Sequence, residues 1–187
     1  MKFSELADYF EKLEKTSSRL SLIEILSKLF HEITDPDELQ KICYLVQGRV
    51  APFFEATEIG MADKTVAKAV ALAYDEPQEK VLHLFTTLGD VGEAVEKISE
   101  KRKAKSEKLS VEHVFDVLVV IAKTSGSGTI EKKIALLSDM LQQVNSLSAK
   151  YLVRIPLSNL RLGIGDPTVL DALATALIVE LFNAFSE

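Results

Sequence analysis

One short stretch of this chain combines residue types that can bind a phosphate group. Residues 159–166 read Asn-Leu-Arg-Leu-Gly-Ile-Gly-Asp, and Pro167 follows. Glycine permits positive φ angles and close backbone approach, and Asp followed by Pro is typical of a helix start with Asp as the N-cap. A tight hairpin at Gly163–Gly165 would then carry free N–H groups into the positive end of a helix, which suits a phosphate. The alternative is a plain turn between two helices, with Ile164 packed in the core.

Helical periodicity runs through both segments that flank this hairpin and through most of the chain. Apolar residues recur at three- and four-residue spacing in about ten segments, and no segment alternates as a strand does. Capping residues predict helix starts at Thr16–Arg19, at Asp35-Pro36, at Gly89-Asp90 and at Ser110. In the helical segment 146–157 we expect Tyr151 to face inward and Arg154 to face outward. The sequence therefore predicts an all-α protein, a compact bundle of about ten helices.

Composition narrows the possible function classes. The 187 residues are 47% hydrophobic, which is enough for a sizeable core, and a net charge of −6 argues against a uniformly basic nucleic-acid coat but not against a local basic face. Cys43 is the single cysteine, so a disulfide framework and a Cys-rich zinc site are excluded, and the pattern fits a reducing compartment. The three histidines are isolated from one another, so we predict neither a metal site nor catalytic residues. No membrane partner is expected, because no apolar run reaches the roughly 20 residues that a spanning helix needs.

The hairpin has an echo earlier in the chain. Glu58–Val66 aligns with Arg161–Val169, and both read charged, apolar, Gly, apolar, small, Asp, any residue, Thr, Val. We therefore predict two halves, roughly 1–104 and 105–187, related by a pseudo-two-fold axis and separated near the basic run 97–108. Chance similarity between short helical segments is the alternative. Because Glu58 stands where Arg161 stands, we expect the second hairpin to bind phosphate better.

Seven stretches, in order along nearly all 187 residues, resemble the N-terminal DNA-binding domain of ATP-dependent DNA ligases, most closely the archaeal ones. They are Phe3–Ala7, Thr16–Leu20, Tyr44–Arg49, Gly89–Glu93, Ser125–Gly128 with Lys132 and Lys133, Tyr151–Arg154, and Arg161–Asp166. The resemblance implies an all-helical domain with pseudo-two-fold symmetry. Such a domain holds nicked duplex DNA across the minor groove while catalytic domains of the same polypeptide close around it.

The resemblance also implies which positions contact DNA. They are the two helix starts and the second hairpin: Thr16, Ser17, Ser18, Arg19, Ser125, Gly126, Ser127, Gly128, Lys132, Lys133, Arg161, Gly163, Ile164 and Gly165. Two positions depart from the family pattern, since Pro156 and Asn159 stand where relatives often have a non-proline residue and a lysine. Some archaeal relatives bind the sliding clamp through a Gln-plus-aromatic motif near Ala104–Lys108. That motif is missing here, which puts clamp binding through this loop in doubt.

The chemistry of ligation is expected outside this chain. The family forms a lysyl-AMP intermediate on a Lys-x-Asp-Gly motif, with ATP and Mg²⁺, and the motif does not occur in these 187 residues. We therefore expect this chain to bind DNA without cofactor and to be inactive alone. The resemblance implies a cytoplasmic, nucleoid-associated protein if the source is archaeal and a nuclear one if it is eukaryotic. The rival hypothesis is a helical protein-interaction scaffold that does not bind DNA and that uses the apolar loop Pro52–Phe54.

Overall fold

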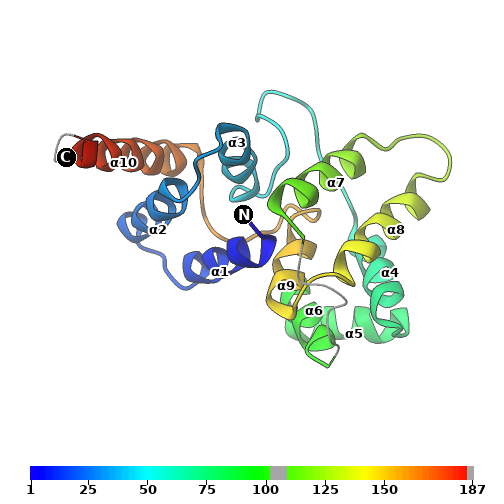
Figure 1. The fold of residues 1–187 in the computed structure, drawn as a ribbon. Helices are drawn as coiled ribbons and strands as arrows, with labels where there is room; N and C mark the ends of the chain where they lie inside the picture. Colours follow the sequence, from blue (N-terminus) through cyan, green and yellow to red (C-terminus); the bar gives the residue numbers. More distant parts are fainter. Residues whose placement is uncertain (102–108, 185–187) are drawn as a thin grey trace.

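A computed structural model describes residues 1–101 and 109–184, with the side chains of the last helix described up to Val179 (Figure 1). Within these residues the regular structure consists of ten α-helices and one isolated antiparallel bridge between Lys2 and Ser110. The helices are α1 (Phe3–Glu14), α2 (Arg19–His31), α3 (Pro36–Leu45), α4 (Asp63–Tyr74), α5 (Gln78–Leu88), α6 (Val91–Ser99), α7 (Val111–Lys123), α8 (Thr129–Leu141), α9 (Ser146–Arg154) and α10 (Asp166–Ala184). The predicted all-α fold is confirmed.

Side-chain caps fix many of the helix starts. The side chains of Ser18, Asp35, Asp90 and Ser110 accept N–H groups in the first turns of α2, α3, α6 and α7. Such a cap satisfies backbone donors that have no partner inside the helix. All four starts were predicted from the sequence because a cap involves residues only two or three positions apart.

The two halves of the chain exchange partners instead of folding as separate lobes. Helix α2 packs against α10, and α8 packs against α4. In the same way α1 packs against α9, and α7 packs against α3. Figure 1 shows the α2–α10 pair and the α4–α8 pair at opposite ends of the molecule. The α2–α10 pairing corresponds in chain order to α8–α4, and α1–α9 to α7–α3, while the pseudo-two-fold relation between the halves stays a prediction. The basic run that we expect at their boundary lies mostly outside the described residues, because these end at 101 and resume at 109.

Helix α1 packs its apolar face into the core and against α9. Its residues Phe3, Leu6, Phe10 and Leu13 are fully buried. The ring of Phe10 meets the ring of Tyr151 in α9 edge to face, with centroids 5.4 Å apart. On its other side α9 packs against α6. Helix α9 therefore lies between two helices, and this placement decides the environment of its polar side chains.

Helix α10 leaves an apolar face exposed. Leu170, Leu177 and Ile178 are between 53% and 64% exposed, while Val169, Ala172 and Ala176 on the opposite face pack against the core. Within the described part of the chain, no helix combines the length and the apolar character needed to span a lipid bilayer.

Candidate nucleic-acid interface

The hairpin at residues 161–165 has the backbone that its glycines predict. Gly163 has φ +65°, and a Cβ added there would meet no atom within 4 Å, so the dihedral angle and not space requires glycine. Within residues 1–101 and 109–184, no acceptor hydrogen-bonds the N–H groups of Gly163, Ile164 or Gly165. The Ile164 side chain is half-buried against the core. The segment is thus a packed turn that still offers three free donors.

The predicted cap of α10 is wrong by one residue. The carbonyl of Gly165 accepts the N–H groups of Thr168 at 3.0 Å and Val169 at 3.2 Å, so Gly165 is the N-cap and Asp166 the first helical residue. The Asp166 carboxylate forms an ion pair with Arg49 and caps no N–H group in the described part of the helix. At the first helical position the negative carboxylate still interacts favourably with the positive end of the helix dipole.

The echo at residues 58–66 repeats the glycine turn and the helix start, although Glu58, unlike Arg161, does not have a positive φ. Gly60 has φ +51°, and the carbonyl of Ala62 accepts the N–H groups of Thr65 at 2.8 Å and Val66 at 3.0 Å. Ala62 therefore takes the place that Gly165 takes in the second hairpin. The N–H of Met61, however, donates to the carbonyl of Pro156 at 3.1 Å. The first hairpin thus uses its central donor to hold the chain that leaves α9, whereas the second keeps its donor free.

Arg161 is held in place on three sides. Its Nη1 lies 2.9 Å from Asp90 Oδ2, its Nη2 donates to the Gly89 carbonyl at 3.2 Å, and its Nε donates to Asn159 Oδ1 at 3.2 Å. The side chain is 46% exposed. A guanidinium carries five N–H donors, so two remain for a ligand.

An open groove of about 470 Å³ lies between this hairpin and the turn after α3. Its walls include Gly163, Gly165, Arg161, Gly48 and Arg49. Arg49 was not among the predicted contacts, although the stretch Tyr44–Arg49 carried part of the family resemblance. Two guanidinium groups, each paired with one carboxylate, and three N–H groups without an acceptor among the described residues lie around this groove and can donate to an anion.

The predicted helix start before α2 lies beside α10. Ser18 Oγ accepts the Ser21 N–H at 3.4 Å, and Thr16 Oγ1 accepts the Ser18 N–H at 3.2 Å. Ser17, Ser18 and Arg19 are exposed. Arg19 Nη2 lies 2.7 Å from Asp171 Oδ2 in α10. Packing of α2 against α10 therefore brings this helix start close to the helix that the second hairpin begins.

The second helix start, before α8, pairs with the first hairpin. Gly126 and Gly128 have φ +92° and +74°, and Gly128 is the N-cap of α8. The predicted contacts Ser125, Ser127 and Lys132 are exposed. Lys133 is half-buried, and its Nζ donates to the carbonyl of Ile59 at 3.3 Å. The tertiary structure thus supplies the first hairpin with a cation although Glu58 stands where the second hairpin has Arg161.

Arg154 does not face outward as expected. Its side chain is 2% exposed, because α9 lies between α1 and α6. Its Nη2 lies 2.9 Å from Asp90 Oδ1, and its Nη1 lies 2.9 Å from Glu14 Oε1. Burial alone lowers the pKa of Arg154, but the hydrogen bonds with Asp90 and Glu14 outweigh burial and raise it. The guanidinium therefore stays charged inside the protein.

Glu14 completes this buried network. Tyr151 donates its hydroxyl to Glu14 Oε2 at 2.6 Å, and Lys150 Nζ lies 3.0 Å from the same oxygen. Burial alone raises the pKa of Glu14, but hydrogen bonds from Tyr151, Lys150 and Arg154 outweigh burial and lower it to about 2. Gly92 in α6 makes room for the network, because a Cβ there would lie 2.4 Å from Arg154 Nε.

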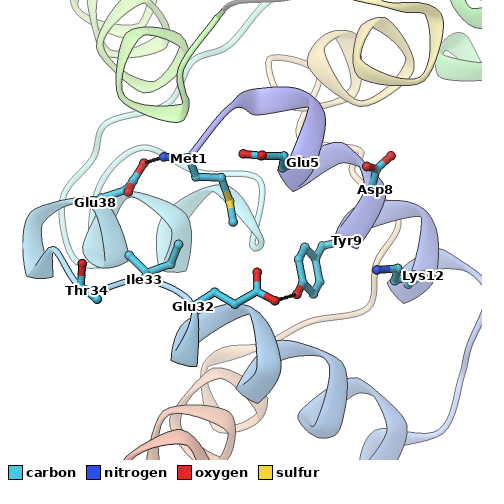
Figure 2. Close-up of a pocket in the computed structure, with 9 residues that line it drawn as sticks. All are labelled: Met1, Glu5, Asp8, Tyr9, Lys12, Glu32, Ile33, Thr34 and Glu38. Atoms are coloured by element: carbon cyan, nitrogen blue, oxygen red, sulfur yellow. Dashed lines mark hydrogen bonds and ion pairs between the residues drawn. The ribbon is translucent and has the colours of Figure 1, made fainter.

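A second groove, of about 430 Å³, lies between α1 and the segment that joins α2 to α3 (Figure 2). Its walls carry Glu5, Asp8, Glu32 and Glu38. The Met1 ammonium pairs with Glu38, and the Tyr9 hydroxyl donates to Glu32 at 2.7 Å. Excess negative charge makes this groove unsuitable for phosphate. Across the described ranges, no group of three or more His, Cys, Asp or Glu side chains is placed to hold a metal ion.

Fold and site together define an all-α domain in which an exposed helix start and a glycine hairpin occur twice, each start lying near the hairpin from the other half of the chain. A family model described as DNA ligase N terminus matches residues 2–174, and the chain belongs to this family. The resemblance found in the sequence is thereby confirmed. Residues Ala104–Lys108, where some archaeal relatives carry the clamp motif, lie outside the described residues.

The individual proteins that the chain resembles are also called DNA ligases. The chain is 44% identical over 176 residues to a probable DNA ligase of Dictyoglomus thermophilum and 40% identical over 181 residues to DNA ligase 2 of Korarchaeum cryptofilum. It is 37% identical over 187 residues to a DNA ligase of Saccharolobus solfataricus. These matches cover 94% to 95% of this chain but only 30% to 31% of each relative. The chain therefore corresponds to less than a third of the proteins that it matches.

Proposed function

We propose that this domain binds nicked duplex DNA without sequence specificity, across the minor groove, and positions it for strand joining by the catalytic domains of a parent ATP-dependent ligase. The lysyl-AMP chemistry, with ATP and Mg²⁺, belongs to those catalytic domains. The relatives are called DNA ligases, and the present chain matches less than a third of each. The contribution proposed for this domain is therefore binding and not catalysis.

The observation that carries the proposal is the groove beside the second hairpin. The free N–H groups of Gly163, Ile164 and Gly165 lie there with the side chains of Arg161 and Arg49. Backbone donors and arginines contact phosphate oxygens, which fix the position of a protein on a duplex but carry no base sequence. A protein that binds through such groups alone accepts any sequence.

The repeated architecture fits a duplex. Each hairpin has a cation and an exposed helix start nearby. These are Arg161 and the start of α2 at the second hairpin, and Lys133 and the start of α8 at the first. The two strands of a duplex are also related by two-fold axes, so a paired site can contact both backbones. An acidic body with its cations gathered at these contacts would orient the DNA and discourage other orientations.

Fluorescence anisotropy with labelled nicked and intact duplexes tests the proposal. We expect the domain to bind DNA at low salt, and affinity to fall as salt rises, because each neutralised phosphate releases counterions. Replacing Arg161 by Gln should reduce the slope of log K against log salt by about 0.9 if the guanidinium neutralises one phosphate. The matched control is Lys28→Gln, which removes one positive charge from an exposed pair with Glu24 and should leave the slope unchanged. Absence of binding to either duplex at low salt would refute the proposal.

A protein-interaction scaffold remains the second candidate, because Phe53 and Phe54 are 76% and 75% exposed with ring centroids 5.6 Å apart. Exposed neighbouring aromatic residues are enriched where proteins meet. Replacing both by Ser tests whether this loop takes part in DNA binding, and the DNA-binding proposal expects unchanged DNA affinity. A loss of DNA affinity in this variant would place the loop in the DNA site.

A further inference from the structure

Asp90 connects the surface hairpin to the interior of the protein. Its side chain is 5% exposed, and Oδ1 accepts the N–H of Glu93 at 2.8 Å as the cap of α6. The same oxygen lies 2.9 Å from Nη2 of the buried Arg154, and Oδ2 lies 2.9 Å from Nη1 of the exposed Arg161. One carboxylate therefore holds a helix start, a buried cation and a cation at the groove.

Beyond Asp90 the network reaches the centre of the fold. Arg154 pairs with Glu14 at the end of α1, and Glu14 also binds Lys150 and Tyr151. A buried charge without its partner strongly destabilises the folded protein. Each side chain of such a network is therefore held firmly in place. The network thus fixes the position of the Arg161 side chain relative to α1, α6 and α9, the helices that carry its members.

The hairpin requires such a constraint. Arg161 itself has φ +61°, in the left-handed region that a residue with a side chain rarely adopts. Conformations of this kind persist when the surroundings over-determine them. The three hydrogen bonds of the guanidinium, to Asp90, Gly89 and Asn159, provide this constraint.

We propose that Asp90 and Arg154 are positioning residues for DNA binding, acting through Arg161 to hold the hairpin that begins at residue 161. Neither side chain reaches the surface, so neither touches DNA. The inference rests on the proposed function and adds to it the reason why the groove is preformed. Preformed donors bind more tightly than mobile ones because less conformational freedom is lost on binding.

The variant Asp90→Asn tests this inference by the sign of its effect. It keeps an oxygen for the Glu93 N–H but removes the negative charge that holds Arg161. Removing a negative charge near DNA tightens binding if only the overall field matters. If Asp90 positions Arg161, the variant should bind DNA about tenfold more weakly, which corresponds to the loss of one charge-assisted hydrogen bond. Glu24→Gln is the matched control, because Glu24 pairs with Lys28 at the exposed surface, outside the proposed contacts, and this variant should bind DNA at least as tightly as the unaltered chain.

A double-mutant cycle identifies the path of the effect. If Asp90 acts through Arg161, the double variant Asp90→Asn, Arg161→Gln should bind DNA only as weakly as Arg161→Gln alone. A merely structural role for Asp90 predicts that the two losses multiply. That result, or an Asp90→Asn variant that binds as tightly as the unaltered chain, would overturn the inference.

Folding of the variants is measured separately by circular dichroism. If Asp90→Asn does not fold, Arg161→Lys carries the test, because it keeps the charge at an exposed position but lacks the planar fork that reaches three acceptors. We expect it to bind about tenfold more weakly, and affinity equal to that of the unaltered chain would contradict positioning. Failure of the unaltered chain to bind DNA would instead contradict the proposed function, so the two failures are distinguishable.

Discussion

Replacing Arg154 by Met should destabilise the domain strongly, although the residue lies in no active site. Methionine is long and flexible and can fill the space of the arginine stem. The substitution removes the contacts of Nε and Nη2 with Asp90 and of Nη1 with Glu14. It therefore leaves two largely buried carboxylates without the cation between them, while changing the packing of α9 very little.

The magnitude follows from what the carboxylates retain. Removing one partner of a buried ion pair costs roughly 3–5 kcal/mol. Asp90 keeps the Glu93 N–H and Arg161, and Glu14 keeps Tyr151 and Lys150, so we expect the lower end, about 3 kcal/mol. With an m-value of about 2 kcal/mol/M in urea, the unfolding midpoint should fall by about 1.5 M.

Urea unfolding followed by circular dichroism provides the measurement, and Arg19→Met provides the control. Arg19 and Asp171 are 60% and 52% exposed, so the loss of their ion pair should change stability by no more than about 0.5 kcal/mol. A loss below about 1 kcal/mol in Arg154→Met would refute the view that the buried network holds α1, α6 and α9 together.

Two further predictions concern the same network. The pKa of Glu14 is lowered from 4.5 to about 2, so the network should contribute up to about 3 kcal/mol above pH 5 and lose it as the pH falls toward 2. The free energy of unfolding of Glu14→Gln should therefore depend less on pH across that window than that of the unaltered chain. The same pH dependence in both proteins would exclude Glu14 as its cause. Gly92→Ala should cost about 1–3 kcal/mol because its Cβ would lie 2.4 Å from Arg154 Nε and 2.9 Å from the Lys150 carbonyl. Thermal unfolding measures this loss against Gly165→Ala, whose Cβ would meet only Pro167 at 3.7 Å, and equal midpoints would contradict the predicted clash.

Features that depend on neighbouring residues could be predicted from the sequence. The caps at Ser18, Asp35, Asp90 and Ser110 involve contacts two or three positions apart. The positive φ of Gly163 follows from the hairpin pattern and the lack of a side chain at that position. The echo between the two hairpins was likewise visible, because equivalent residues form equivalent turns.

Features that depend on packing could not be predicted in this way. Arg154 lies in α9, a helix of nine residues that packs against both α1 and α6. The apolar periodicity of the helix alone could not reveal that a second helix covers the side where Arg154 lies. Asp166 was predicted as the N-cap of α10, but it is the first helical residue, and its carboxylate pairs with Arg49, 117 positions away. Lys133 contacts the first hairpin although it lies 74 positions away in the sequence. Because local sequence could not show this contact, Glu58 was the only charged side chain expected at that hairpin.

The sequence by itself determined the helical class, most helix starts, the repeated hairpin and the family of this protein. Each of these depends on interactions within a turn or two, or on patterns that relatives share. The tertiary structure alone decided that the repeats exchange partners, that Arg49 and Lys133 join the hairpins, and that Asp90 connects Arg161 to a buried network. Ion pairs between distant residues form only after packing has brought the helices together, so no local pattern encodes them.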